Sequence, residues 1–127
     1  MLIRIPVSVG ELFDKITILK IKAARLSDAG QLENVRRELE ELEAVAKAAV
    51  TGSPALDELV ARLQAINDGL WDVEDGKRAH EREGRFDADF VALARRVYKE
   101  NDQRAALKRE INRLTGSTLV EEKSHGG

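Results

Sequence analysis

The side chains best able to do chemistry lie in the second half of the chain, at positions where a bundle helix normally carries apolar residues. An apolar face that includes Leu63 and Leu70 continues, at about 100° per residue, through Glu74. The next expected helix has a similar interruption on its apolar arc: Asn101, Arg104 and Lys108. A carboxylate that faces cations in a partly buried site can act as a general acid or base, so Glu74 is the candidate for that role.

These interruptions should meet, because residues 84 and 85 form a short turn between two helices that are then antiparallel neighbours. At about 1.5 Å per residue, positions equally far from the turn lie level, which places Asn67 near Arg104 and Glu74 near Asn101. Three amphipathic side chains would line the edge: Trp71, Arg78 and Tyr98. The sequence thus predicts these ligand-binding residues: Asn67, Trp71, Arg78, Tyr98, Asn101, Arg104 and Lys108.

Two interpretations of this polar site stay open on the sequence. One is a pocket for a small anionic ligand, since arginine and lysine side chains bind phosphate and carboxylate groups. The other is a buried structural network in which Glu74 pairs with Arg104 or Lys108. Such an ion pair contributes uncertain net stability, because desolvation costs several kcal/mol per ion. Both interpretations therefore remain as hypotheses.

Helical periodicity and turn residues predict the elements that position this site. The expected fold class is all-α, a four-helix antiparallel bundle with a short extended N-terminal lead-in and a C-terminal strap. Ser8 and Glu11 form a capping-box pattern at the start of the first helix, and Asp87 can cap the last one. The helices are expected at about residues 9–26, 29–50, 55–83 and 88–114.

The first expected helix is apolar on two sides. Leu12, Ile16 and Leu19 have the spacing of a bundle seam. A second apolar side is predicted as an interface for a second copy or a partner protein, and it contains three large side chains: Phe13, Ile18 and Ile21. Asp14 falls within this second side, where an isolated carboxylate is costly unless it is paired or hydrogen-bonded.

The composition indicates one helical domain over residues 1–127. The chain has 21 Lys and Arg residues against 23 Asp and Glu residues, a formal charge of −2, so no net field favours nucleic acid. It has no cysteine, no signal-peptide pattern and no apolar run long enough to span a membrane, which indicates a cytoplasmic location. The tail at 118–127 is expected to be partly flexible.

No cofactor and no metal are expected. Glu40 and Glu43 have ExxE spacing, but no second acidic pair in a suitable context follows. His80 lies near a helix end and His125 in the tail, so neither has convincing metal partners. The chain has no glycine-rich phosphate loop and no nucleophile, histidine and acid at triad spacing, which disfavours covalent hydrolase chemistry.

Four segments together carry a resemblance to a known family: GELFDKITILKIK, LWDVEDGKR, FVALARRVYKENDQRAALKREIN and STLVEEKS. They resemble a bacterial family of domains of unknown function, and the resemblance covers almost the whole chain. It implies a bacterial, cytoplasmic protein and supports the domain boundaries, but it brings no established catalytic residues. Some members of that family are associated with surface-polysaccharide genes, so the resemblance also implies a link to surface-polysaccharide metabolism.

Two functions follow as hypotheses. We first interpret the chain as a non-enzymatic binding module with a polar pocket between helices. The alternative is a metal-independent enzyme or binding protein for a small phosphorylated or carboxylate ligand. In that alternative Arg78, Arg104 and Lys108 hold the anion, and Glu74 serves as the acid or base.

Overall fold

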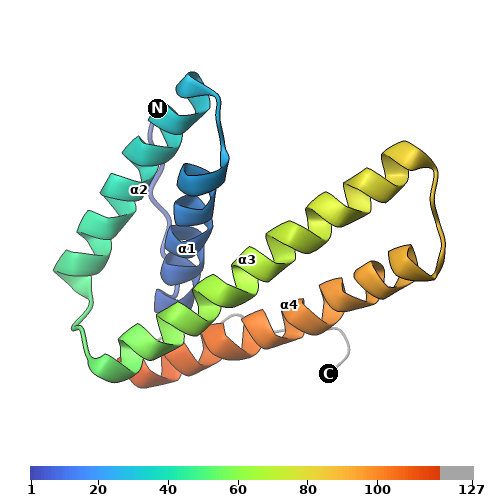
Figure 1. The fold of residues 1–127 in the computed structure, drawn as a ribbon. Coiled ribbons are helices and arrows are strands. Elements are labelled where there is room, and N and C mark those ends of the chain that lie inside the picture. Colours follow the sequence, from blue (N-terminus) through green and yellow to red (C-terminus); the bar gives the residue numbers. More distant parts are fainter. Residues whose placement is uncertain (118–127) are drawn as a thin grey trace.

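The computed structural model describes residues 1–117, and four α-helices account for most of them (Figure 1). They are α1 (Val9–Arg25), α2 (Ala29–Ala49), α3 (Pro54–Glu83) and α4 (Ala88–Thr115). Each helix begins and ends within one residue of its predicted position. No strand occurs in residues 1–117, so the predicted all-α four-helix bundle is confirmed. The predicted C-terminal strap and tail, at 118–127, lie outside the described residues.

Local side-chain chemistry starts and stops the helices at the predicted places. Ser8 caps α1, because its Oγ accepts a hydrogen bond from the backbone N–H of Glu11 at 3.1 Å. Asp87 caps α4 in the same way, accepting from the backbone N–H of Phe90 at 3.1 Å. At the other end of α3, Gly84 has a φ of 66°, a left-handed conformation that glycine adopts without steric cost. The turn at Gly84 therefore sets α4 antiparallel to α3.

The four helices form two antiparallel hairpins that meet at α1 (Figure 1). α1 packs against each of the other three helices, whereas α2, among the helices of residues 9–115, packs only against α1. α3 and α4 pair with each other, and their ends next to the Gly84 turn extend beyond α1. α1 is therefore the helix that positions one hairpin relative to the other.

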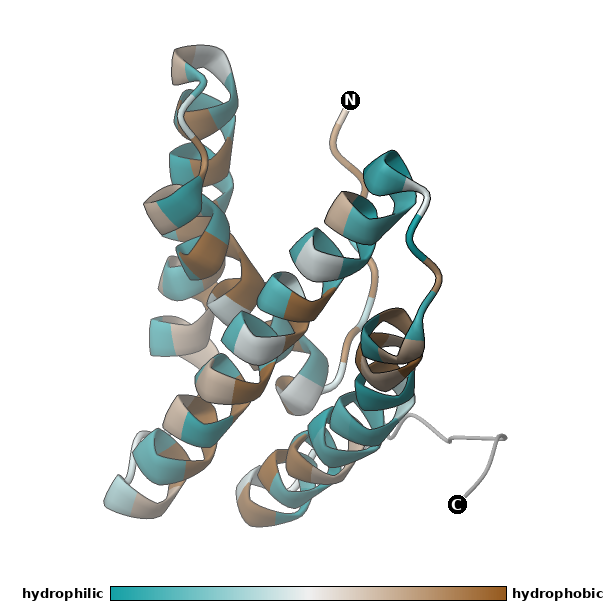
Figure 2. Ribbon diagram, turned by 45° about the vertical axis from the view of Figure 1, so that its right-hand side comes forward, coloured by the Kyte–Doolittle hydropathy of each residue, from teal (hydrophilic) through white to brown (hydrophobic). Residues whose placement is uncertain are grey.

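The hydrophobic core lies where α1 meets the ends of α3 and α4 that are remote from their turn. Leu63 and Ile111 are completely buried there, together with Leu56 and Leu107, and Phe13 of α1 packs against this cluster. Burial of each such side chain contributes about 1.5–3 kcal/mol. Figure 2 shows that the middle of α4, the right-hand helix in that view, is mostly hydrophilic.

The N-terminal lead-in of residues 1–8 precedes α1 as an extended segment, as predicted. Its large apolar side chains Leu2, Ile3 and Ile5 are exposed to solvent. Ser8 is the point at which the lead-in becomes buried, because this residue caps α1. The core and the polar contacts between helices are thus built from Ser8 onward.

Candidate functional site

A buried carboxylate on α1, that of Asp14, lies at the centre of the polar residues between the helices. It is 1% exposed, and one guanidinium contacts both of its oxygens. Arg104 Nε donates to Oδ1 at 2.8 Å, and Arg104 Nη2 donates to Oδ2 at 2.5 Å. Asn67 Nδ2 also donates to Oδ1, at 3.0 Å. This bidentate geometry compensates the charge of Asp14 in a place that water hardly reaches.

Thr17 extends the contacts of Asp14 by one turn along α1. Its hydroxyl donates to the backbone carbonyl of Asp14 at 2.8 Å and accepts a hydrogen bond from Asn67 Nδ2 at 2.9 Å. Gln64 Nε2 donates to the backbone carbonyl of Thr17 at 3.3 Å. Helices α1, α3 and α4 therefore meet in one hydrogen-bonded group, which we call the Asp14 cluster: Asp14, Thr17, Asn67 and Arg104.

Two further polar contacts join the start of α1 to the next turns of α4. Lys108 Nζ binds Glu11 Oε2 at 2.7 Å. One turn later, Oδ1 of the buried Asn112 accepts a hydrogen bond from the backbone N–H of Gly10 at 2.7 Å. Positions 104, 108 and 112 recur every four residues, so they form one polar stripe of α4 facing α1.

The environment of Asp14 lowers its pKa. Burial raises the pKa of this carboxyl, but hydrogen bonds from Arg104 and Asn67 and the positive charges of Arg104 and Lys108 outweigh that effect. The pKa of Asp14 is therefore held below its usual value of 3.8. A general acid needs the opposite shift, and a general base needs access to a substrate proton. The cluster thus has the properties of a structural ion pair.

The lowered pKa of Asp14 predicts an acid-dependent contribution to stability. Its folded-state pKa lies below the unfolded value, so the contribution is complete above about pH 4 and is lost as the pH falls through the folded-state pKa. We expect Asp14→Asn to be less stable than the unmodified protein at neutral pH, with a difference that shrinks in acid. Urea unfolding between about pH 6 and about pH 3 measures this difference. A difference that stays constant would contradict the prediction.

The structure brings together four of the seven residues predicted to bind a ligand. Asn67 and Arg104 lie level with each other, since both bind Asp14. Asn101 Oδ1 accepts a hydrogen bond from Arg104 Nη1 at 3.4 Å. Lys108 lies one turn further along α4 and pairs with a second carboxylate of α1. The polar residues of α3 and α4 do meet, but α1 supplies the carboxylates.

The candidate acid or base, Glu74, lies on a different surface. Its side chain is 48% exposed and pairs with Lys77, with Nζ and Oε1 3.6 Å apart. The core position in this turn is taken by Val73, which is completely buried. The apolar stripe of a helix continues at every third or fourth residue. From Leu70 it continues three residues later, at Val73, because burying an apolar side chain costs less free energy than burying a carboxylate. The expected pairing of Glu74 with the cations of α4 is therefore wrong.

The other three predicted ligand residues lie on α3 and α4 closer to their turn. Trp71 is half-buried, and Arg78 and Tyr98 are exposed. At this level α3 is tied to the end of α1, where Arg25 Nη1 donates to Asp72 Oδ1 at 2.6 Å. That hydrogen bond lowers the pKa of the exposed Asp72 carboxyl. A ligand-binding role for the three residues stays a prediction.

The three residues predicted as an interface on α1 do not share one exposed patch. Ile21 is 2% exposed and thus covered within the chain, and Ile18 is half-buried. Phe13 is also half-buried and packs against the hydrophobic core. The expected patch is absent because α1 contacts all three other helices, so most of its surface is used inside the chain. Phe13 nevertheless borders an open groove.

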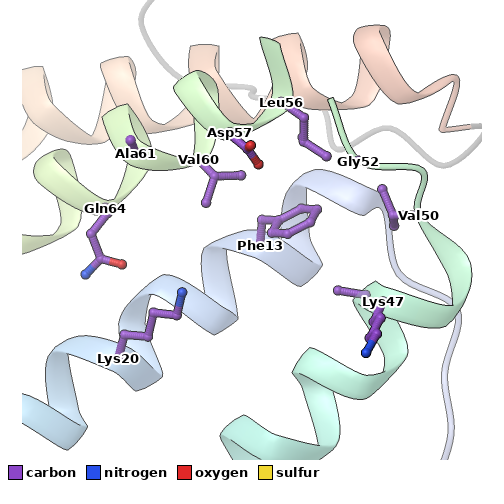
Figure 3. A pocket seen from close by; sticks show the side chains of 11 residues that line it. Phe13, Lys20, Lys47, Val50, Gly52, Leu56, Asp57, Val60, Ala61 and Gln64 are labelled. Carbon is purple, nitrogen blue, oxygen red and sulfur yellow. The ribbon is translucent and has the colours of Figure 1, made fainter. Parts of the chain in front are cut away.

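This groove lies between α1, α2 and α3 and has a volume of about 640 Å³ (Figure 3). Phe13 lies between the two walls, with α3 on one side and α2 on the other. The apolar lining continues on both walls, through these residues: Ala46, Val50, Leu56, Val60 and Ala61. Lys20 and Lys47 line it as well, as do Asp57 and Gln64. Because α2 does not pack against α3, the space between the two hairpins stays open here.

The sequence pattern gave no site role to Asp14, Thr17 or Glu11. A signal for Asp14 exists, because a carboxylate within an apolar side of a helix needs a partner. The sequence pattern pairs Arg104 with Glu74 of the adjacent α3. The observed partner of Arg104 is Asp14, which lies 90 residues earlier in the chain. Pairing the one carboxylate on an apolar side with the arginine in the core arc of α4 would have found the contact.

Metal and membrane sites have no support in residues 1–117. No group of three histidine, aspartate or glutamate side chains in this range could hold a metal ion. No helix in it is both long and apolar enough to cross a membrane.

Comparison with known proteins gives a match to a family. No curated protein and no solved structure matches the chain. A family model described as a family of unknown function, DUF6165, matches residues 3–126. This match spans nearly the whole sequence and includes every element of the groove and of the Asp14 cluster. The chain therefore belongs to DUF6165, a family of unknown function.

Proposed function

We propose that this chain is a non-enzymatic binding module that takes up one helix of a partner protein in the groove between its two hairpins. The observation that carries the proposal is the open side of α2. This helix packs against α1 alone within the described structure, and the space between it and α3 has an apolar lining. A helix lying there would contact α1, α2 and α3 together. An amphipathic helix in an apolar groove is a common mode of recognition.

The size of the groove supports a short helical contact. Phe13 and Lys20 are seven residues apart on α1, and Leu56 and Gln64 are eight apart on α3. These spacings correspond to about 11–12 Å, or two helical turns. The groove is open to solvent and has a volume of about 640 Å³. The groove can therefore hold a few apolar side chains from two turns of a partner helix.

The Asp14 cluster supports the proposal because it fixes the positions of the helices that form the groove. Its floor and walls come from different helices: Phe13 from α1, Ala46 from α2 and Val60 from α3. Hydrogen bonds from Asn67 to Asp14 and to Thr17 tie α1 to α3 with directional geometry. A buried polar network can specify one arrangement of helices even where it adds little net stability. In this proposal the network holds the two hairpins at the spacing that a partner helix requires.

Within residues 1–117, the contacts described above do not favour the alternative function, an enzyme or binding protein for a small anion. Arg104 binds Asp14, and Lys108 binds Glu11, whereas Glu74 lies on a separate surface. The link to surface-polysaccharide metabolism that the resemblance implies stays a prediction. The proposal therefore rests on the groove.

A peptide titration with one blocking variant tests the proposed function. The probe is a fluorescein-labelled amphipathic peptide of about 18 residues, with leucines at i, i+3, i+4 and i+7 and glutamines beside them. We expect it to bind the unmodified protein, as measured by fluorescence anisotropy. Ala61→Arg should weaken binding by about tenfold or more, because Ala61 is exposed on the groove wall and the larger side chain would fill the groove.

Ala92→Arg is the matched control for this variant. Ala92 is also an exposed alanine within a helix, but it lies on α4 and does not line the groove. The control adds the same charge and volume and should leave binding unchanged, while circular dichroism checks that both variants fold. The proposal fails if the peptide does not bind, or if the two variants weaken its binding equally.

A further inference from the structure

The side of the groove toward α2 carries two lysine side chains, and we infer from them that the partner helix is acidic along one edge. This inference rests on the proposed function, since it gives the charge of the helix that the groove would take. Lys47 stands on α2, whereas Lys20 stands on α1, two turns from Phe13, and reaches toward Glu43 of α2 (Figure 3). Asp57 and Gln64 line the opposite wall, on α3. The α2 side therefore has two ammonium groups beside one carboxylate, that of Glu43, and the α3 side has the carboxylate of Asp57.

The two lysines are placed to bind carboxylates on successive turns of a helix. Lys20 Nζ lies 4.0 Å from Glu43 Oε1, at the outer limit of an ion pair, and its side chain is 49% exposed. Glu43 and Lys47 are four residues apart on α2, which places the lysines about one turn apart along the wall. A partner helix that lies along this wall can therefore pair with both lysines through carboxylates three or four residues apart.

The opposite wall makes the charge pattern one-sided. Asp57, in the first turn of α3, would repel a carboxylate on the second edge of the partner helix. The inferred partner thus has an apolar stripe on Phe13, carboxylates toward Lys20 and Lys47, and neutral or basic residues toward Asp57. Such a pattern favours a helix with carboxylates toward Lys20 and Lys47. It also disfavours a helix with basic residues on that edge.

Three peptides with one leucine stripe test the inference. On the edge that faces the lysines they carry glutamine, glutamate or lysine at two positions one turn apart. At an ionic strength of about 20 mM, the glutamate peptide should bind about 3- to 10-fold more tightly than the glutamine peptide, and the lysine peptide more weakly by a similar factor. The differences should shrink at about 0.5 M salt, because exposed ion pairs are screened.

A charge-reversal variant assigns the preference to the two lysines. The double variant Lys20→Glu with Lys47→Glu should reverse the order of the three peptides. Lys15→Glu with Lys99→Glu is the matched control, since it makes the same change at two exposed lysines outside the groove. The control should keep the original order. Circular dichroism checks that both double variants retain their helices.

The outcomes separate this inference from the proposed function. If the three peptides bind equally and Ala61→Arg weakens all of them, the groove binds helices without a preference for acidic ones, and the inference alone fails. If none of them binds, both proposals fail. If Ala61→Arg converts a dimer into a monomer in sedimentation velocity, a second copy of the chain occupies the groove. That result would overturn the partner helix proposed here.

Discussion

Replacing Arg104 with methionine is expected to lower the free energy of unfolding by about 3–5 kcal/mol. Arg104 donates to both oxygens of Asp14, and Asp14 is 1% exposed. The variant would leave a buried carboxylate without its guanidinium partner, with Asn67 as its side-chain hydrogen-bond donor. The loss is therefore mainly the cost of desolvating that charge. Urea unfolding followed by circular dichroism measures it.

Two further variants show whether the loss comes from the buried charge. Arg95→Met removes the same charge from an exposed position of α4 and should change stability by no more than about 0.5 kcal/mol. Asp14→Leu combined with Arg104→Met removes both charges and should recover most of the loss, since apolar side chains often replace a buried ion pair without cost. A loss below about 1 kcal/mol for Arg104→Met, or no recovery in the double variant, would contradict this account.

The helices themselves could be predicted because their signals are local. Ser8 and Asp87 accept hydrogen bonds from N–H groups three residues later, and Gly84 ends α3 in a left-handed conformation. Each signal acts within about one turn, so it does not depend on how the helices pack. The short turn at Gly84 also fixes the register of α3 and α4, which is why Asn67 and Arg104 lie level.

The carboxylate at the centre of the site could not be predicted in the same way. The sequence pattern predicts Glu74 as the inward carboxylate. Successive residues differ by about 100° around a helix, so either Val73 or Glu74 could face inward, and the apolar Val73 does so. Asp14 reaches Arg104 because α1 packs against α4, and no turn connects those two helices. The partner of Asp14 therefore depends on tertiary packing, which cannot be predicted from the helical periodicity of a single segment.

The groove also could not be predicted from the sequence pattern. The apolar positions of α1 indicated a second contact surface, but packing within the chain covers Ile21 and leaves Phe13 at the groove. The open side of α2 arises from the angle between the two hairpins. That angle depends on the contacts of α1 at both ends, the Asp14 cluster near its start and Arg25 with Asp72 at its end. Only the arrangement of all four helices defines it.

Replacing Gly10 with alanine tests the contact of α1 with α4 and is expected to lower the free energy of unfolding by about 1–3 kcal/mol. A Cβ atom at this position would lie 2.5 Å from the backbone oxygen of Lys108 and 3.0 Å from Oδ1 of Asn112. A backbone atom cannot turn aside as a side chain does, so α1 would have to move away from α4. The net loss already includes about 1 kcal/mol of helix propensity that alanine gains over glycine. Thermal and urea unfolding measure it.

Gly52→Ala is the control, because a Cβ atom there would meet nothing within 4 Å and the backbone has no positive φ. It should be neutral or stabilising by less than about 1 kcal/mol. If Gly10→Ala proves equally harmless, α1 and α4 are not in close contact. If the contact is close, moving α1 also weakens the bonds of Asp14 to Arg104. Gly10→Ala combined with Arg104→Met should therefore cost less than the sum of the single variants, because both act on one packed interface.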